Sequence, residues 1–247
     1  MTHTGARVWQ WVGIIAILCL FGGAYWYFQV RASTLNQSQN DLNTSGLVGL
    51  WSFNGDDMSG TTAYDRSGAG NTGTLTNGPT KTIGKIGQGV SFDGTDDYVD
   101  ITNVAFSGTF TFSTWFYTTN NSQTGIIFGE DGGSDAGGPK IGMTGGNIFV
   151  RVNNTGGDSS VAVPTVGQWH HMVVTRNSSS KVDLYIDGGT ATRLNGDAAQ
   201  TDTYDLDKIG CNGSTPDQCF AGKLDELRIY NRDLSAAEIS SLYNTSR

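Results

Sequence analysis

The stretch TFTFSTWFYTT, residues 109–119, indicates more about the fold of this chain than any other segment. Its β-branched and aromatic residues favour an extended strand. Successive side chains of a strand point to opposite faces, so three phenylalanines share one face with Thr114. The other face carries Thr111, Ser113, Trp115 and Tyr117. We therefore predict a long strand whose two faces differ in chemistry.

Shorter runs of the same kind recur along the chain, bounded by Gly, Asn, Asp or Ser. They predict strands at residues 47–53, 89–92, 98–101, 125–129, 148–152, 161–163, 170–175, 182–186 and 223–230. Asp187-Gly188 is a hairpin-type turn signal after one of them. The sequence has no repeat of 20–50 residues, which disfavours a propeller or solenoid. Many short strands with turn signals predict an all-β antiparallel sandwich.

One short helix is predicted at the C-terminal end. Ser235 and Glu238 form a capping box, in which each side chain accepts a hydrogen bond from a free backbone N–H group of the other residue. Leu234, Ile239 and Leu242 give the segment an apolar side, and it ends near Asn244.

The composition excludes some classes of function. Only Arg7 and Arg31 of the 15 basic residues precede Ser33, so residues 33–247 carry 13 basic and 23 acidic residues. Nucleic acid is bound by clustered Lys and Arg, so we expect no nucleic-acid partner. The aromatic content of 11% argues against disorder. About 200 residues suffice to bury one sizeable core.

The N-terminal segment predicts a membrane anchor within residues 1–32. Residues 8–30, VWQWVGIIAILCLFGGAYWYFQV, carry no charge. As a helix they would span roughly 34 Å, enough for a hydrocarbon core of about 30 Å. Aromatic residues lie near both ends, where membrane interfaces favour them. The alternative is a cleaved signal segment, because small residues occur at positions 22–24 and 32.

A polar linker, residues 33–45, precedes the predicted domain at residues 46–247. Arg7 and Arg31 flank opposite ends of the apolar segment, so the positive-inside rule barely fixes its orientation. The acidic, Gly-rich and Asn-rich body and its cysteines favour export. We expect an extracytoplasmic domain, membrane-anchored, or secreted if the segment is cleaved.

The order of several motifs carries a family resemblance. They are GLWSF at 49–53, DRSGAGN at 65–71, FDGTDDYV at 92–99, the strand at 110–116, WHHMVVT at 169–175, LYIDG at 184–188, FAGKLDELRIYNR at 220–232 and the Leu-Ser-x-x-Glu-Ile helix at 234–239. Over about residues 46–245 this series resembles the laminin-G-like, concanavalin A-like jelly-roll family. The family includes sugar binders, protein binders and enzyme accessory modules, so the resemblance indicates fold rather than function.

Cys211 and Cys219 are predicted to form a disulfide, the default for two nearby cysteines in an exported domain. Closing a loop of about nine residues contributes roughly 2.5 kcal/mol in the chain-entropy model. The alternative is two free thiols in a cytosolic domain.

Calcium is the predicted metal, because oxygen ligands are plentiful and His or Cys clusters are absent. The family resemblance implies a structural calcium held by a loop near the first strands and an Asp in the last strand. Asp225 matches the last-strand position, and Asp65 and Asn71 are the companions. The alternative is that Asp65 and Asn71 only make turn hydrogen bonds. A second acidic cluster, at residues 93–97, is expected to shape a hairpin turn.

Catalytic signatures are missing from the sequence. His170 and His171 are adjacent on a strand and point to opposite faces, so they are not expected to chelate one ion. The Glu-x-Asp-x-x-Glu pattern of laminarinase-like relatives is absent, as are nucleophile-elbow and phosphate-loop motifs. We expect the protein not to be an enzyme.

A ligand face requires exposed aromatic residues with polar neighbours, because aromatic rings pack against the apolar faces of sugars. Strand residues that could supply one are Trp115, Tyr117, Phe149, Arg151 and Tyr185. The alternative is that strand aromatics are core, as we expect for Trp51 and Trp169. The polar, Gly-rich loops 129–139 and 153–158 are further candidates for function.

The sequence therefore predicts a membrane-anchored, non-catalytic module that recognises a carbohydrate or a cell-surface protein. One alternative is a structural, self-assembling surface protein. The other is an enzyme related to glycoside hydrolases, which would need catalytic carboxylates that the motifs do not provide.

Overall fold

The computed structural model describes residues 44–129, 140–151, 159–194, 203–213 and 218–245. From Gly46 onward the chain forms one compact unit. The predicted membrane segment at residues 8–30 lies outside the described residues, as do residues 33–43 of the predicted linker, residues 130–139 of the first candidate loop and the whole of the second, residues 153–158. No helix in the described part of the chain has the length and apolar character needed to cross a membrane.

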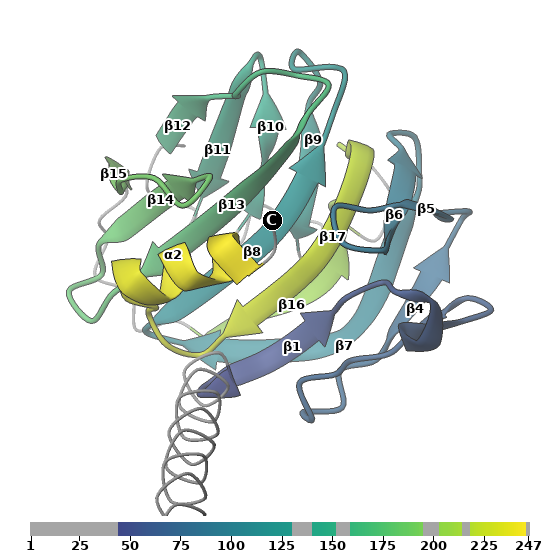
Figure 1. The fold of residues 1–247 in the computed structure, drawn as a ribbon, viewed down its shortest axis with the longest axis horizontal. Coiled ribbons are helices and arrows are strands. Elements are labelled where there is room, and N and C mark those ends of the chain that lie inside the picture. Colours follow the sequence, from purple (N-terminus) through teal and green to yellow (C-terminus); the bar gives the residue numbers. More distant parts are fainter. Residues whose placement is uncertain (1–43, 130–139, 152–158, 195–202, 214–217, 246–247) are drawn as a thin grey trace, which may run out of the picture. The chain divides into compact units, whose positions relative to one another are not determined.

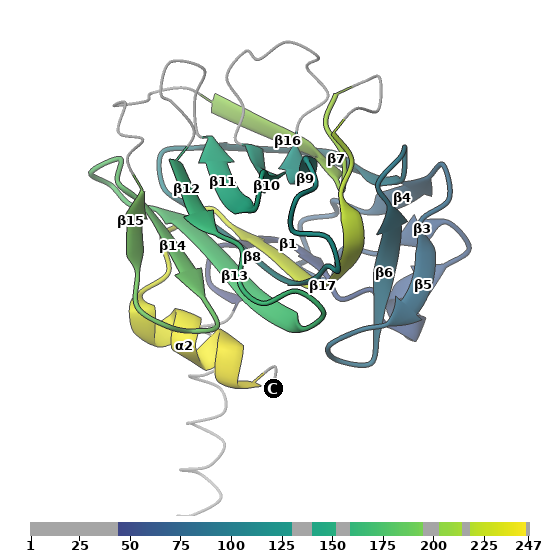
Figure 2. The ribbon, with the colours of Figure 1, turned by 90° about the horizontal axis from the view of Figure 1, so that it is seen from above.

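Two antiparallel sheets pack face to face, as the sequence predicts (Figures 1 and 2). The first sheet has the strand order β15-β14-β13-β8-β17-β6-β5, with β1 paired to β17. Its strands are β1 (Leu47–Trp51), β5 (Thr80–Ile83), β6 (Gln88–Asp93), β8 (Phe110–Tyr117), β13 (Trp169–Arg176), β14 (Val182–Ile186), β15 (Thr192–Leu194) and β17 (Ala221–Tyr230).

The second sheet has the order β12-β11-β10-β9-β16-β7-β4-β3-β2. Its strands are β2 (Met58–Ser59), β3 (Thr62–Ala63), β4 (Gly73–Thr76), β7 (Tyr98–Ser107), β9 (Gly125–Gly129), β10 (Lys140–Thr144), β11 (Asn147–Arg151), β12 (Ser159–Ala162) and β16 (Thr203–Ile209). A short 3₁₀ helix, η1 (Gly55–Asp57), precedes β2.

The main core fills the space between the sheets. Phe110, Phe112 and Phe116 of β8 are buried in it, as the alternation along this strand predicts. The rings of Phe112 and Phe128 lie 5.0 Å apart, which joins β8 to β9 of the other sheet. Trp51 is fully buried in the same core, and its indole N–H donates to the Asn71 carbonyl at 3.1 Å.

The outer face of the first sheet has its own cover, the helix α2 (Ala236–Thr245). Figures 1 and 2 show α2 lying across β8, β13 and β14 on the side away from the second sheet. Its apolar side packs in a second cluster, which consists of Val173, Tyr185, Tyr230, Leu234, Ile239 and Leu242. The predicted capping box is confirmed: Ser235 N–H donates to Glu238 Oε2 at 2.8 Å, and Glu238 N–H donates to Ser235 Oγ at 3.3 Å.

The predicted disulfide between Cys211 and Cys219 is confirmed. It joins the end of β16 to the start of the segment that leads into β17. Next to it, the Phe220 N–H donates to the Gly210 carbonyl at 2.8 Å. The cross-link therefore helps to hold the beginning of β17, where the candidate site lies.

Candidate ligand-binding site

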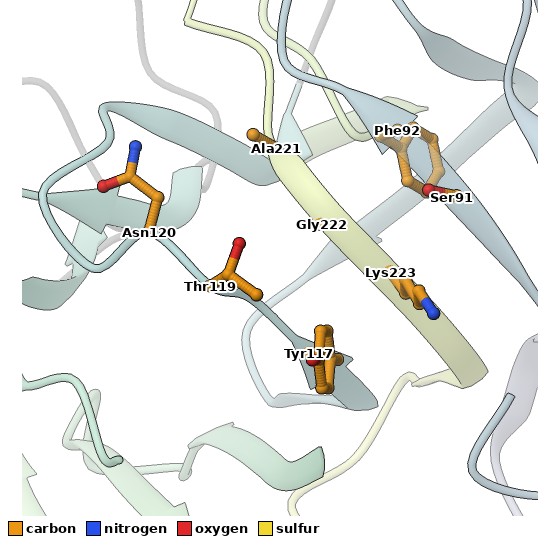
Figure 3. Close-up of a pocket in the computed structure, with 8 residues that line it drawn as sticks. All are labelled: Ser91, Phe92, Tyr117, Thr119, Asn120, Ala221, Gly222 and Lys223. Carbon is orange, nitrogen blue, oxygen red and sulfur yellow. The ribbon is translucent and has the colours of Figure 1, made fainter. Parts of the chain in front are cut away.

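A pocket of about 430 Å³ lies where β6, β8 and β17 run side by side (Figure 3). Its lining comprises Ser91, Phe92, Tyr117, Thr119, Asn120, Ala221, Gly222 and Lys223. Strand register explains the arrangement, because Lys223 of β17 is opposite Tyr117 of β8 on one side and Ser91 of β6 on the other. These three residues therefore form a row across the outer face of the first sheet.

The row continues onto β13 through Trp169, which is the cross-strand partner of Tyr117. The two rings have centroids 5.8 Å apart and are tilted by 52°. On the other side of Tyr117, Lys223 Nζ lies 5.2 Å from the ring centroid. Both aromatic residues are half-buried. We call Trp169, Tyr117, Lys223 and Ser91 the outer row.

Buried polar groups fix the segment that follows β8. Gln123 Nε2 donates to the Ala221 carbonyl at 3.0 Å and to Thr118 Oγ1 at 2.9 Å, while the Ala221 N–H donates to Gln123 Oε1 at 2.6 Å. Thr118 and Gln123 are almost fully buried. This network ties residues 118–123 to β17 and places Thr119 and Asn120 at the pocket, as Figure 3 shows.

The chemistry of the pocket suits reversible binding of a polar ligand with apolar faces. Its eight lining residues offer aromatic surface, hydroxyl and amide groups and one ammonium group. None of these eight carries a carboxylate, an imidazole or a thiol. Gly222 is required here by close packing, since a Cβ would overlap the Tyr117 carbonyl and lie 2.6 Å from the Phe220 ring.

The structure places the three predicted ligand residues in different surroundings. Tyr117 lines the pocket. Trp115 is only 1% exposed and stacks against Tyr243 of α2, with centroids 5.5 Å apart, so it is covered rather than exposed on the outer face. Arg151 ends β11, opposite Lys140 in the second sheet, so the structure does not bring it to this pocket. Trp169, which we expected in the core, lies instead on the outer face.

Asp65 holds the loop 65–71 onto β1. Its Oδ1 accepts hydrogen bonds from the N–H groups of Leu50 at 2.9 Å and Ser67 at 2.8 Å. Its Oδ2 accepts from Ser67 Oγ at 2.8 Å and from Asn71 N–H at 2.9 Å. A carboxylate has about four lone-pair sites, so Asp65 has none left for a cation. Asn71 Nδ2 donates to the Val48 carbonyl at 2.7 Å.

Asp225 is tied to a different turn. It is fully buried, and its carboxyl accepts hydrogen bonds from the N–H groups of Ile86 and Glu226, each at 2.8 Å. Burial raises the pKa of Asp225 to about 7. The structure thus joins Asp65 to Asn71 but commits Asp225 to the turn between β5 and β6. This arrangement does not fit the calcium site expected from these three residues.

The other acidic cluster shapes a turn, as its sequence suggests. The ligand atoms of Asp93, Asp96 and Asp97 lie within 4.8 Å of one another. Asp97 Oδ2 accepts from the Asp93 N–H at 2.9 Å, and Asp93 Oδ1 accepts from the Thr95 N–H at 2.7 Å. Burial raises the pKa of Asp97, with the neighbouring carboxylates adding to the effect.

The two histidines face opposite sides of β13, as predicted. His170 Nδ1 lies 2.7 Å from Asp187 Oδ2, and its Nε2 lies 2.9 Å from the Thr165 carbonyl. His171 Nε2 lies 2.9 Å from Ser113 Oγ on the other face. Burial lowers the pKa of His171 to about 3, so its ring is neutral near pH 7. These contacts are structural, and the pair does not converge on one ion.

Comparisons with solved structures agree with this fold. Domain 4 of an extracellular GH43 arabinanase from Geobacillus stearothermophilus, solved with arabinotriose, is 21% identical with a TM-score of 0.65, over 81% of this chain and 98% of that one. The binding domain of botulinum neurotoxin DC, in complex with SialylT, is 13% identical with a TM-score of 0.63, over 83% of this chain and 52% of that one.

Trypanosoma rangeli sialidase, in complex with sialic acid, is 16% identical with a TM-score of 0.60, over 87% of this chain and 38% of that one. No curated protein matches the chain in sequence. At these identities the structural likeness establishes the fold alone. Residues 93–240 match the family model of the concanavalin A-like lectin/glucanases superfamily. The chain therefore belongs to the laminin-G-like family of the concanavalin A-like lectin/glucanases superfamily.

Proposed function

We propose that this protein is a carbohydrate-binding module whose ligand lies along the outer row. One observation carries the proposal: two half-buried aromatic rings and an ammonium group stand side by side next to a pocket lined with hydroxyl and amide groups. Aromatic rings pack against the apolar C–H faces of sugars. Hydroxyl and amide groups then fix the orientation of the bound ring through hydrogen bonds.

The structural neighbours support this choice of ligand class. The three neighbours named above were solved in complex with arabinotriose, SialylT and sialic acid. One fold hosts many functions, so no neighbour identifies the particular sugar. Within this chain, the outer row is the feature that supports a carbohydrate ligand.

The proposed activity is binding without turnover. Most glycoside hydrolases flank the scissile bond with two carboxyl groups about 5–10 Å apart. The eight residues around this pocket include no acid. Among these eight residues a bound sugar would therefore meet no acid–base pair.

The proposed location is the extracytoplasmic face of a membrane. The apolar segment at residues 8–30 supports anchoring, and the disulfide supports an oxidising compartment. If the segment is cleaved as a signal, the same domain is secreted.

A glycan array tests the binding function. The full chain is applied in a polyoxyethylene detergent, whose headgroup contains no sugar to compete for the site. We expect selective binding by the native chain and its loss in Tyr117→Ala and Trp169→Ala. Tyr64→Ala is the matched control, because Tyr64 is an exposed tyrosine that also has a cation, Arg66, over its ring at 5.4 Å.

An array without selective signals from the native chain would contradict the proposal and favour a protein partner or self-assembly. If the control Tyr64→Ala lost binding as much as Tyr117→Ala and Trp169→Ala, the loss would come from lower stability of the folded chain rather than from the removal of ligand contacts.

A further inference from the structure

The row of residues next to the outer row contains two buried polar atoms without partners. Trp115 and His171 are cross-strand neighbours on β8 and β13, and their ring centroids lie 5.1 Å apart. Each residue is 1% exposed. Trp115 Nε1 and His171 Nδ1 have no hydrogen-bond partner within the described part of the chain. Buried side-chain polar atoms are usually paired, so two orphans at one place need an explanation.

The two nitrogens are complementary to a hydroxyl group. The Trp115 indole N–H is a donor only. Because the His171 ring is neutral near pH 7 and its Nε2 faces the Ser113 hydroxyl, Nδ1 can serve as an acceptor in one of its tautomers. A sugar hydroxyl accepts from an indole N–H and donates to an imidazole nitrogen, so neighbouring hydroxyls of one sugar satisfy both groups.

Tyr243, in the last turn of α2, covers this place. Its ring stacks on Trp115 with an interplanar angle of 23° and on His171 at 26°. Gly188 makes room for it, since a Cβ there would lie 2.7 Å from the Tyr243 ring. The place that the Tyr243 ring occupies is therefore shaped for a flat ring that lies against the Trp115 indole.

The helix is held to the sheet by other residues. Leu234, Ile239 and Leu242 belong to the second hydrophobic cluster, and Tyr243 does not. Movement of Tyr243 thus leaves the apolar anchor of α2 in place.

We propose that Tyr243 covers a second saccharide subsite, formed by Trp115 and His171, that extends the outer-row site when the last turn of α2 moves aside. This inference rests on the proposed carbohydrate-binding function. Trp115 and Tyr117 are two residues apart on β8, which corresponds to about 6.6 Å along the strand. The opened site therefore holds a longer oligosaccharide than the outer row alone. Lys85 borders it, with Nζ 4.5 Å from the Trp115 ring.

The test compares chain lengths. Linear oligosaccharides of two to eight sugar units, including arabino-oligosaccharides, are titrated against the native full chain and against Tyr243→Ala. We expect Tyr243→Ala to bind the longer members about tenfold more tightly, with the shortest unchanged. Tyr243→Phe keeps the covering ring and should behave as the native chain does. Trp115→Phe in the Tyr243→Ala background removes the indole N–H and should remove most of the gain.

Two further variants protect the test against loss of folding. A chain that ends at Leu242 keeps the anchor of α2 and should reproduce the gain, and thermal melting reports whether each variant is folded. Tyr243→Ser serves if Tyr243→Ala unfolds. Unchanged affinities at every length, or a gain that survives Trp115→Phe, would overturn the second subsite. In that case binding by the native chain that depends on Tyr117 and Trp169 would leave the proposed function standing. Absence of glycan binding by every variant would overturn both.

Discussion

Tyr117 and Trp169 meet across β8 and β13 at the end of the sheet that α2 leaves uncovered. Two residues further along the same strands, Trp115 and His171 form the equivalent pair beneath Tyr243. The cross-strand pair of the outer row is thus half-buried, whereas the equivalent pair in the next row is fully buried. The position of one short helix decides which aromatic residues a ligand can reach.

Lys223 should determine how the site responds to charged sugars. It is the charged residue among the eight that line the pocket. We expect Lys223→Gln to weaken binding of sialic acid-containing glycans several-fold and to leave neutral glycans nearly unchanged, because an exposed charge pair contributes up to about 1 kcal/mol. Titrations at low and high salt measure the effect, which salt should diminish in the native chain.

Lys81→Gln provides the matched control for that comparison. Lys81 lies on β5 of the same sheet, and its Nζ donates to the Met58 carbonyl at 3.4 Å rather than lining the pocket. Equal weakening by Lys81→Gln would show a general effect of net charge. Stronger binding of acidic glycans by Lys223→Gln would contradict the assigned role.

Asp65 should matter to stability whether or not divalent cations are present. Replacement by Ala removes four hydrogen bonds to a carboxylate, and we expect a loss of roughly 2–4 kcal/mol in the free energy of unfolding. Urea unfolding in calcium and in a chelator measures it. Asp56→Ala is the control, since Asp56 is exposed and uses its backbone carbonyl to accept from Arg66. A large loss of native stability on chelation would restore a metal role for this loop.

The disulfide should stabilise the sandwich by constraining the unfolded chain. Changing both Cys211 and Cys219 to Ser should lower the free energy of unfolding by about 2.5 kcal/mol. Unfolding of the native chain with and without a reductant should give a similar difference. If reductant changes the stability of the double Ser variant as well, the effect does not arise from this disulfide.

Most of the fold follows from local sequence patterns. Strands with alternating or continuous apolar residues, such as β8, β9, β13 and β14, were predictable to within two residues at each end. β5 and β10 were not, because TKTI is polar and lies exposed at a sheet edge, while KIGMT contains a glycine and a lysine. β16 is mixed in the same way, and its Lys208 is buried against the Tyr98 ring at 4.1 Å. Pairing with distant strands determines such segments.

The site was predictable only in part for a similar reason. Alternation places Trp115 and Tyr117 on the outer face, but only the tertiary position of α2 decides that the first is covered. Trp169 carried a usable signal, because it alternates with His171 and Val173 against the core residues Met172 and Val174. The sequence also did not show how the expected calcium ligands are used: Asp65 accepts hydrogen bonds from the N–H groups of Leu50, Ser67 and Asn71 and from the Ser67 hydroxyl.

Two buried groups on the outer face should give opposite dependences of stability on pH. Burial raises the pKa of Asp225 to about 7, so between about pH 4 and 7 the folded chain keeps a proton that the unfolded chain loses. This contribution to the free energy of unfolding falls as pH rises. Burial lowers the pKa of His171 to about 3, so between about pH 3 and 6.5 the unfolded chain binds a proton that the folded chain excludes. This contribution rises with pH.

The two slopes largely offset each other in the native chain between about pH 4 and 6.5. Asp225→Asn removes the contribution of the aspartate and leaves that of His171. We expect the free energy of unfolding of this variant to rise with pH by up to about 1.4 kcal/mol per pH unit over this range. His171→Gln leaves the contribution of Asp225, so the free energy of unfolding should fall with pH by a similar amount per unit, up to about pH 7. Urea unfolding at half-unit pH steps measures each slope, and Asp56→Asn, at an exposed carboxylate, should keep the native profile. Parallel profiles for the two variants would show that these groups do not titrate as their burial requires.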